Sequence, residues 1–140
     1  INYNVDFEED ELADFEAEVI ENQYLSDRVD LKYTTLYWVT LGEFGLNLTE
    51  AAVMALITGL SKKRGYCNAS KQHFANLLHV SRQTIHSCLK NLRTKGLIRL
   101  SRKLVNGVRL TKPGSRWLVL MRVIKVRQHD LRLQKNNRIR

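Results

Sequence analysis

The sequence predicts a mainly α-helical fold with one small β-hairpin (α+β). Ser70 and Ser81 each precede a short segment with apolar residues at helical spacing, and a serine hydroxyl at this position can accept a hydrogen bond from the first turn of a helix. Gly96 follows the second segment and can adopt the left-handed conformation that ends a helix. Asn106-Gly107 is a strong signal for a two-residue hairpin turn. Two capped helices followed by a hairpin form the pattern of a winged helix-turn-helix.

The two short helices have distinct buried and exposed faces. In the first, Phe74, Leu77 and Leu78 share one face, and Ala75 is small where the second helix must approach. His79-Val80 forms the turn. The second helix buries Ile85, Leu89 and Leu92, with Cys88 at the edge of the stripe. Its opposite face is polar and carries Arg82, Gln83, His86, Ser87, Lys90, Arg93 and Thr94.

Three segments precede this motif. Residues 6–23 are acidic with apolar residues at helical spacing, which predicts an amphipathic acidic helix or, alternatively, a partly disordered acidic tail. Residues 31–39 are rich in aromatic and β-branched residues and predict a strand or extended segment. Residues 41–47 contain two glycines and predict a turn.

A further helix is expected after Leu48. Thr49 is its predicted N-cap, and Leu48 is expected to pack on Val53 as a hydrophobic staple. Residues 61–65 form a basic turn that ends this helix. Its expected apolar face consists of Ala52, Val53, Leu56, Ile57 and Leu60.

The last predicted helix follows the hairpin, with Pro113 in its first turn and a frayed end over residues 135–140. The organisation expected is an acidic N-terminal extension over residues 1–47, a winged helix-turn-helix over residues 48–114 and a basic C-terminal helix over residues 115–140. We expect all three to form one compact domain.

Charge is distributed very unevenly along the chain. Residues 1–48 hold twelve acids and two bases, a net charge of −10, whereas residues 49–140 hold two acids and 21 bases, a net charge of +19. Such asymmetry favours a polyanionic partner for the second part. A solvated basic surface, or one neutralised by the acidic segment, is the alternative.

Several classes of function find no support in the residues. Two cysteines are too few for a disulfide scaffold, and no apolar run approaches the ~20 residues of a membrane span. No phosphate-binding loop, nucleophile elbow or metalloprotease motif is present, so no enzymatic activity and no cofactor are expected. His73, His79, His86 and Cys67 lack the spacing of a metal site. We expect a protein of the prokaryotic cytoplasm or nucleoid.

Residues 48–98 resemble the winged-helix domains of phage and plasmid replication proteins and related small regulators. The likeness is carried by residues 48–52, 64–70, 75–78, 80–85 and 92–98. Residues 108–114 resemble the wing exit of MarR-type repressors and of plasmid centromere-binding proteins. Asn68-Ala69 departs from the pattern, because family members commonly have a larger residue there, often proline. The resemblance implies a winged-helix fold and DNA binding.

In a helix-turn-helix the N-terminal part of the second helix contacts base edges and the first helix crosses the backbone. Arg82, Gln83 and His86 are therefore the predicted base-reading residues. Predicted phosphate contacts are Ser70, Lys71, Gln72, Ser81, Thr84, Ser87 and Lys90. Predicted wing contacts are Arg102, Lys103 and Arg109. For any single cation, a solvated surface charge is the alternative.

The last helix is the predicted dimerisation element. Its apolar stripe is longer than one small core requires and consists of Trp117, Leu120, Met121, Ile124 and Leu131. The alternative is that this stripe completes the core of its own chain. The acidic N-terminal segment is expected to contact a protein partner or the basic last helix.

These observations together predict a dimeric, sequence-specific double-stranded DNA-binding protein that regulates transcription. Two alternatives remain open. The first is a plasmid or phage replication initiator, or a partition adaptor, and the second is a protein-interaction winged helix that does not bind DNA.

Overall fold

The computed structural model describes residue 8, residues 13–26 and residues 32–139. The chain divides by its internal contacts into two units, residues 1–33 and residues 34–140. The single compact domain expected for the whole chain stays a prediction, and the helix-turn-helix segment lies within the second unit.

The first unit contains helix α1 (Asp14–Ser26), with Asp14 and Glu16 in its first turn, where acids suit the positive end of the helix dipole. The expected acidic helix over residues 6–23 is thus confirmed only from Asp14 onward. Glu8 is not helical, and Asp6 lies outside the described residues. Phe15, Val19 and Tyr24 of α1 are exposed.

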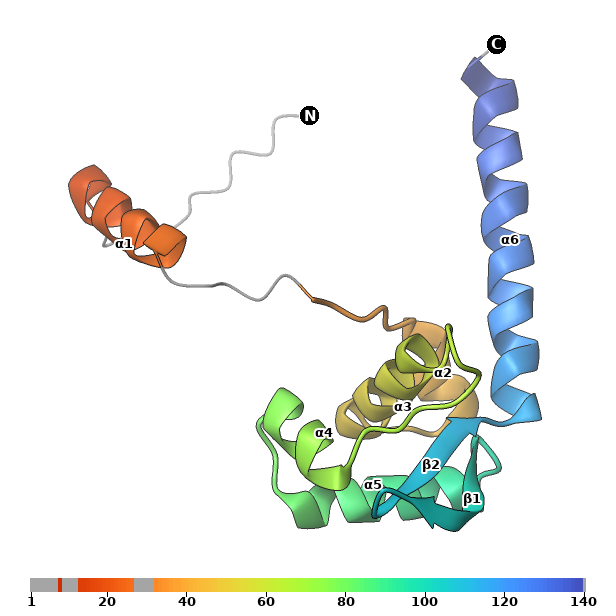
Figure 1. Ribbon diagram of the computed structural model, residues 1–140. Coiled ribbons are helices and arrows are strands. Elements are labelled where there is room, and N and C mark those ends of the chain that lie inside the picture. Colours follow the sequence, from red (N-terminus) through yellow and green to blue (C-terminus); the bar gives the residue numbers. More distant parts are fainter. Residues whose placement is uncertain (1–7, 9–12, 27–31, 140) are drawn as a thin grey trace. The chain divides into compact units, whose positions relative to one another are not determined.

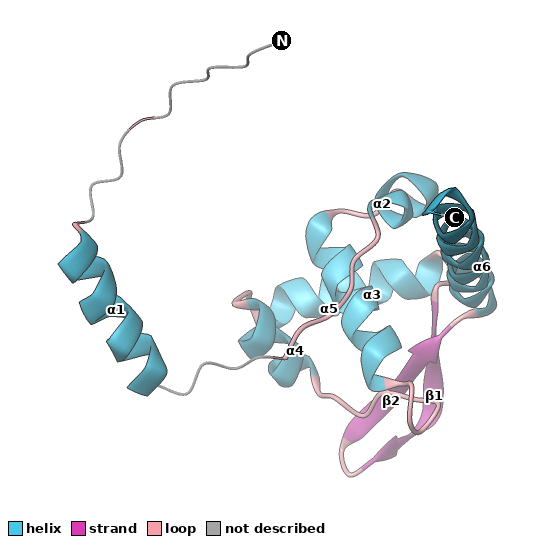
Figure 2. Ribbon diagram, turned by 90° about the horizontal axis from the view of Figure 1, so that it is seen from above, coloured by secondary structure: helices cyan, strands magenta, loops and turns pink. Residues whose placement is uncertain are grey.

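The second unit contains seven elements in its described part (Figures 1 and 2). They are α2 (Trp38–Phe44), α3 (Leu48–Leu60), α4 (Lys71–Leu78), α5 (Arg82–Thr94), β1 (Ile98–Val105), β2 (Val108–Pro113) and α6 (Ser115–Ile139). The two strands form one antiparallel hairpin. No helix in the described ranges combines the length and the apolarity needed to cross a membrane.

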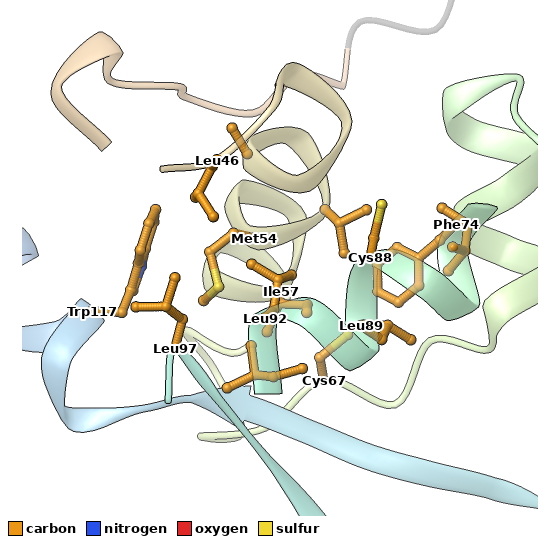
Figure 3. Close-up of a cluster of buried hydrophobic side chains, with 14 of the residues drawn as sticks. Leu46, Met54, Ile57, Cys67, Phe74, Cys88, Leu89, Leu92, Leu97 and Trp117 are labelled. Atoms are coloured by element: carbon orange, nitrogen blue, oxygen red, sulfur yellow. The ribbon is translucent and has the colours of Figure 1, made fainter. Parts of the chain in front are cut away.

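Apolar side chains of α3, α4, α5, β1 and α6 meet in one core, and partly buried residues of α2 pack against it (Figure 3). Met54 and Ile57 of α3 pack with Phe74 of α4 and Leu92 of α5. Trp117 at the start of α6 closes the cluster on one side. The core therefore fixes α3, α4 and α5 against one another and holds the hairpin beside them.

Helix α2 at Trp38–Phe44 contradicts the extended segment expected at residues 38 and 39 and the turn expected at residues 41–44. Residues 32–37 are neither helix nor strand, and residue 31 lies outside the described residues. Thr40 is buried and its hydroxyl donates to the Tyr37 carbonyl over 2.7 Å, and Gly45 ends the helix with φ 62°. The Phe44 ring packs on Trp117 with centroids 5.8 Å apart. Packing against the core thus overrides a strand preference that depends on composition.

The start of α3 also differs from the prediction. Asn47, and not Thr49, is the N-cap: its side chain accepts from the Glu50 N–H over 2.8 Å, and Glu50 Oε1 accepts from the Asn47 N–H over 3.0 Å. This is a reciprocal capping box. Leu48 is the first helical residue and is exposed, so it does not act as a staple on Val53.

The face of α3 that packs inward is only partly the one expected. Val53 and Ile57 are buried as predicted, and Leu60 is exposed. Ala51, Met54 and Ala55 are buried as well. The inward face is broader because neighbouring elements cover α3 on several sides.

Helix α6 begins at Ser115, because Pro113 still belongs to β2, where it pairs with Ile98. The helix continues to Ile139, so the expected fraying from residue 135 is not seen before the end of the described chain. Gly114 joins the strand to the helix, and its N–H donates to the Leu97 carbonyl over 2.7 Å. A Cβ at Gly114 would collide with the carbonyl oxygen of Gly96.

This close approach predicts that Gly114→Ala destabilises the protein by about 1–3 kcal/mol, the usual cost of overpacking. Gly42→Ala is the matched control, because open space surrounds the position of its Cβ within α2. That change should stabilise the protein by about 0.5–1 kcal/mol, since glycine is unfavourable in a helix. Urea unfolding followed by circular dichroism measures both, and equal effects of the two substitutions would contradict the account.

Candidate nucleic-acid interface

The joints between α4 and α5 have the predicted geometry. The Ser70 hydroxyl accepts from the His73 N–H and the Ser81 hydroxyl accepts from the Thr84 N–H, each over 3.1 Å. Both serines are therefore N-caps, as predicted. His79 ends α4 in the left-handed conformation with φ 54°, an arrangement that its sequence does not indicate.

Helix α5 is oriented by its buried stripe. Ile85, Leu89 and Leu92 are buried as predicted, and Cys88, expected at the edge, is buried with them. Burial, and then the negative charge of Glu50, raise the pKa of the Cys88 thiol. The polar face of α5 is consequently exposed, and it carries Arg82, Gln83, Thr84, His86, Ser87, Lys90 and Arg93.

The three predicted base-reading residues lie together. Arg82, Gln83 and His86 line an open hollow with Lys71 of α4. Lys71 Nζ lies 2.7 Å from His86 Nδ1. No local sequence pattern indicates this contact, because it joins residues 15 positions apart on different helices.

Three of the remaining predicted contacts of this region have hydrogen-bonding partners within the chain. Gln72 donates from Nε2 to Asn76 Oδ1 over 2.9 Å, so part of its hydrogen-bonding capacity is used within α4. The Ser81 and Thr84 hydroxyls lie 2.8 Å apart. His73 and His79 are exposed whereas Cys67 is buried, and the part of the chain that the structure describes holds no cluster of three metal-ligating side chains.

The hairpin has the predicted turn. Asn106 and Gly107 both have positive φ, 52° and 75°, and Val105 pairs with Val108. Arg109, one of the predicted wing contacts, pairs with Leu104. The turn between β1 and β2 lies at the end of the ribbon farthest from α6 (Figure 1).

Ser101 is a wing residue that sequence reasoning missed. The register of β1 shifts between Leu100 and Leu104, so the strand is irregular there. The Ser101 hydroxyl accepts from the Leu110 N–H over 2.9 Å and donates to the Lys103 carbonyl over 2.8 Å. It thus replaces ladder bonds lost at the bulge, where the predicted contacts Arg102 and Lys103 are exposed.

A second group of missed residues ties the wing base to the helices. Lys95 Nζ donates to the carbonyls of Phe44 and Gly45 over 2.9 and 2.7 Å, at the end of α2. Arg116 Nη1 donates to the Lys95 carbonyl over 2.9 Å, and its guanidinium lies 5.8 Å from the centroid of the Phe44 ring. Lys95 and Arg116 are therefore structural cations of this junction.

Residues 45–98 match the family model described as a helix-turn-helix domain. This segment is therefore similar to helix-turn-helix domains, and α4 and α5 with their serine caps have the arrangement of that fold. The match ends at Ile98, and the hairpin of β1 and β2 follows the domain as its wing. The replication-protein type that the sequence resembles stays a prediction.

Solved structures with a similar backbone include a crystal structure of MarR, 20% identical, which covers 69% of each chain with a TM-score of 0.47. A complex of MepR from S. aureus with DNA is 12% identical and covers 86% of this chain and 76% of its own, with a TM-score of 0.49. The homodimeric domain of Mb0332 from Mycobacterium bovis, a possible ArsR-family regulator, is 13% identical and covers 89% and 94%, with a TM-score of 0.46. No curated protein matches the sequence.

Proposed function

We propose that this protein binds double-stranded DNA in a sequence-specific manner as a dimeric transcriptional regulator. The observation that carries the proposal is the orientation of α5 in the helix-turn-helix domain. Its buried stripe of Ile85, Cys88, Leu89 and Leu92 leaves Arg82, Gln83 and His86 together on the exposed face.

These side chains suit the edges of base pairs in the major groove, which admits an α-helix. An arginine donates two hydrogen bonds to guanine, and a glutamine forms a bidentate pair with adenine. Each such pair discriminates against the wrong base by about 1–3 kcal/mol. Arg82 and Gln83 lie in the first turn of α5, the part of a recognition helix that contacts bases.

Phosphate contacts position the protein and supply most of the non-specific affinity. Lys90 and the wing cations Arg102, Lys103 and Arg109 are exposed and suit this role. The excess of positive charge over residues 49–140 supports it further. Polar groups on α4 and α5 that suit phosphates in the same way are Ser70, Lys71, Gln72, Ser81, Thr84 and Ser87.

Helix α6 is the proposed dimerisation element. It extends well beyond the packed helices of its unit (Figure 1), and its residues from Lys125 to Arg138 are exposed. Of the predicted stripe, Trp117 is only 3% exposed and Met121 packs against the core, so these two residues already have partners in their own chain. Leu131 is exposed, and Leu120 and Ile124 are half-buried.

A second stripe on α6 is better suited to a partner helix. Val119, Val123, Val126 and Leu133 are all exposed. The first three follow the four- and three-residue spacing of a coiled-coil seam, and Leu133 lies one heptad after Val126, with Asp130 at the seam position between them. A second copy of the chain would cover this stripe. A twofold dimer would then place two α5 helices about 34 Å apart, in successive major grooves of a palindromic site.

The exposed acidic helix α1 favours a second candidate function, a replication initiator or partition adaptor that recruits a partner. Phe15, Val19 and Tyr24 are exposed beside Glu16, Glu18 and Glu21. Selection of bound sites from random DNA separates the two candidates. One palindrome supports the regulator, whereas cooperative filling of repeated sites supports the initiator or adaptor.

The DNA-binding proposal predicts a strong dependence of affinity on salt. If about six phosphates are contacted, the logarithm of the association constant should fall with a slope of roughly −5 against the logarithm of the salt concentration. Fluorescence anisotropy on a selected duplex and on an unrelated duplex measures this slope. The absence of binding to any duplex at low salt would contradict the proposal.

Substitutions in α5 provide the control for base reading. Arg82→Ala and Gln83→Ala should each weaken binding to the selected duplex about 5- to 150-fold, the equivalent of roughly 1–3 kcal/mol, and weaken non-specific binding much less. Arg138→Ala removes one positive charge near the end of α6 and should leave the ratio of the two affinities unchanged. Equal losses on both duplexes in the α5 variants would argue against base reading.

The dimer proposal predicts that Val126→Glu yields a monomer, because the substitution places a charge in the centre of the exposed stripe. Gln128→Glu is the matched control, since residue 128 is also exposed and lies about 200° further round the helix. Analytical ultracentrifugation measures the mass of each variant. If Val126→Glu sediments as a dimer, the second stripe of α6 is not the interface.

A further inference from the structure

The contact between Lys71 and His86 determines which ring nitrogen of the histidine accepts a hydrogen bond and which one donates. Lys71 Nζ lies 2.7 Å from His86 Nδ1. An ammonium group has three donors and no acceptor, so His86 Nδ1 must accept the hydrogen bond. The contact is therefore satisfied by the imidazole tautomer that carries its ring proton on Nε2.

The two side chains come from rigid parts of the fold. Lys71 is the first residue of α4, directly after the Ser70 cap, and it is half-buried. His86 follows Ile85, which is fully buried. Phe74 and Ala75 of α4 are buried in the same core as Ile85, so α4 and α5 are held against each other. This packing keeps Lys71 and His86 close together.

The resulting hollow presents mainly hydrogen-bond donors. Arg82 and Lys71 only donate, His86 offers the Nε2–H, and Gln83 alone among the lining residues can both donate and accept. In the major groove, guanine presents two acceptors, N7 and O6, whereas cytosine presents a donor and adenine one of each. A site that presents mainly donors matches guanine best.

We propose that Lys71 is a positioning residue that holds His86 as an Nε2–H donor, and that His86 thereby reads guanine through N7. The inference rests on the proposed binding of duplex DNA. It assigns Lys71 a role different from the phosphate contact expected from its place in the sequence. A phosphate also presents only acceptors, so the test must separate a base edge from the DNA backbone.

The test uses a selected duplex in which each guanine is replaced in turn by 7-deazaguanine, which has C–H in place of N7 and keeps its base pairing. We expect one guanine in each half-site at which the wild-type protein loses affinity about tenfold and His86→Ala loses none. A contact between His86 and a phosphate would instead leave all guanine positions equally sensitive in the two proteins, and this result would overturn the proposal.

Variants of Lys71 test the positioning role. Lys71→Met should reduce the 7-deazaguanine penalty at that guanine to less than about twofold, and Lys71→Arg, which keeps a donor, should restore it. Lys90→Met removes the same charge from the exposed face of α5 and should keep the full penalty while reducing the salt slope by about one. Circular dichroism verifies that each variant is folded.

Two outcomes separate the failure of this inference from failure of the proposed function. If Lys71→Met keeps the full 7-deazaguanine penalty and reduces the salt slope by about one, Lys71 is a phosphate contact and the inference is wrong while DNA binding stands. If the wild-type protein binds no duplex, the proposed function fails and the inference fails with it.

Discussion

The structure depends most on the burial of one face of α5. Ile85 and Leu92 are fully buried, and each large apolar side chain contributes about 1.5–3 kcal/mol when it is removed from water. Rotating α5 about its axis would expose these side chains, so the helix has one favourable orientation. That orientation determines which polar residues reach the solvent together. The proposed recognition of DNA therefore depends first on the packing of α5 in the core, and only then on the chemistry of the exposed side chains.

The junction of α2, α5 and α6 attaches the hairpin and the long last helix to the core that orients α5. Gly96 and Gly114 allow the two ends of the hairpin to approach closely, and Lys95 bonds both to the end of α2 and, through its carbonyl, to Arg116. Trp117 then inserts into the core at the first turn of α6. The wing and the long helix are consequently anchored to the same core as α5, which would couple the spacing of two recognition helices to the geometry of a dimer.

The sequence alone predicts those parts of the fold that local chemistry determines. The serine caps at residues 70 and 81, the Asn106-Gly107 turn and the buried stripe of α5 depend on a few neighbouring residues, and the structure confirms them. Helix α2 could not be predicted in this way, because Phe44 gains its partner, Trp117, only when distant segments pack. Local signals also compete. Asn47 and Thr49 both lie near the start of α3, and only the reciprocal bond with Glu50 decides between them.

In the candidate site too, some features follow from the local sequence and others depend on tertiary packing. The exposure of Arg82, Gln83 and His86 follows from helical periodicity, whereas the bond from Lys71 to His86 depends on how α4 packs against α5.

The most direct test of the central claim is an NMR titration of the ¹⁵N-labelled protein with duplex DNA that carries a selected site. The account predicts the largest amide shifts at residues 81–87 of α5 and its cap, with smaller shifts along the hairpin. Shifts confined to the basic residues of α6, with the amides of α5 unchanged, would contradict it.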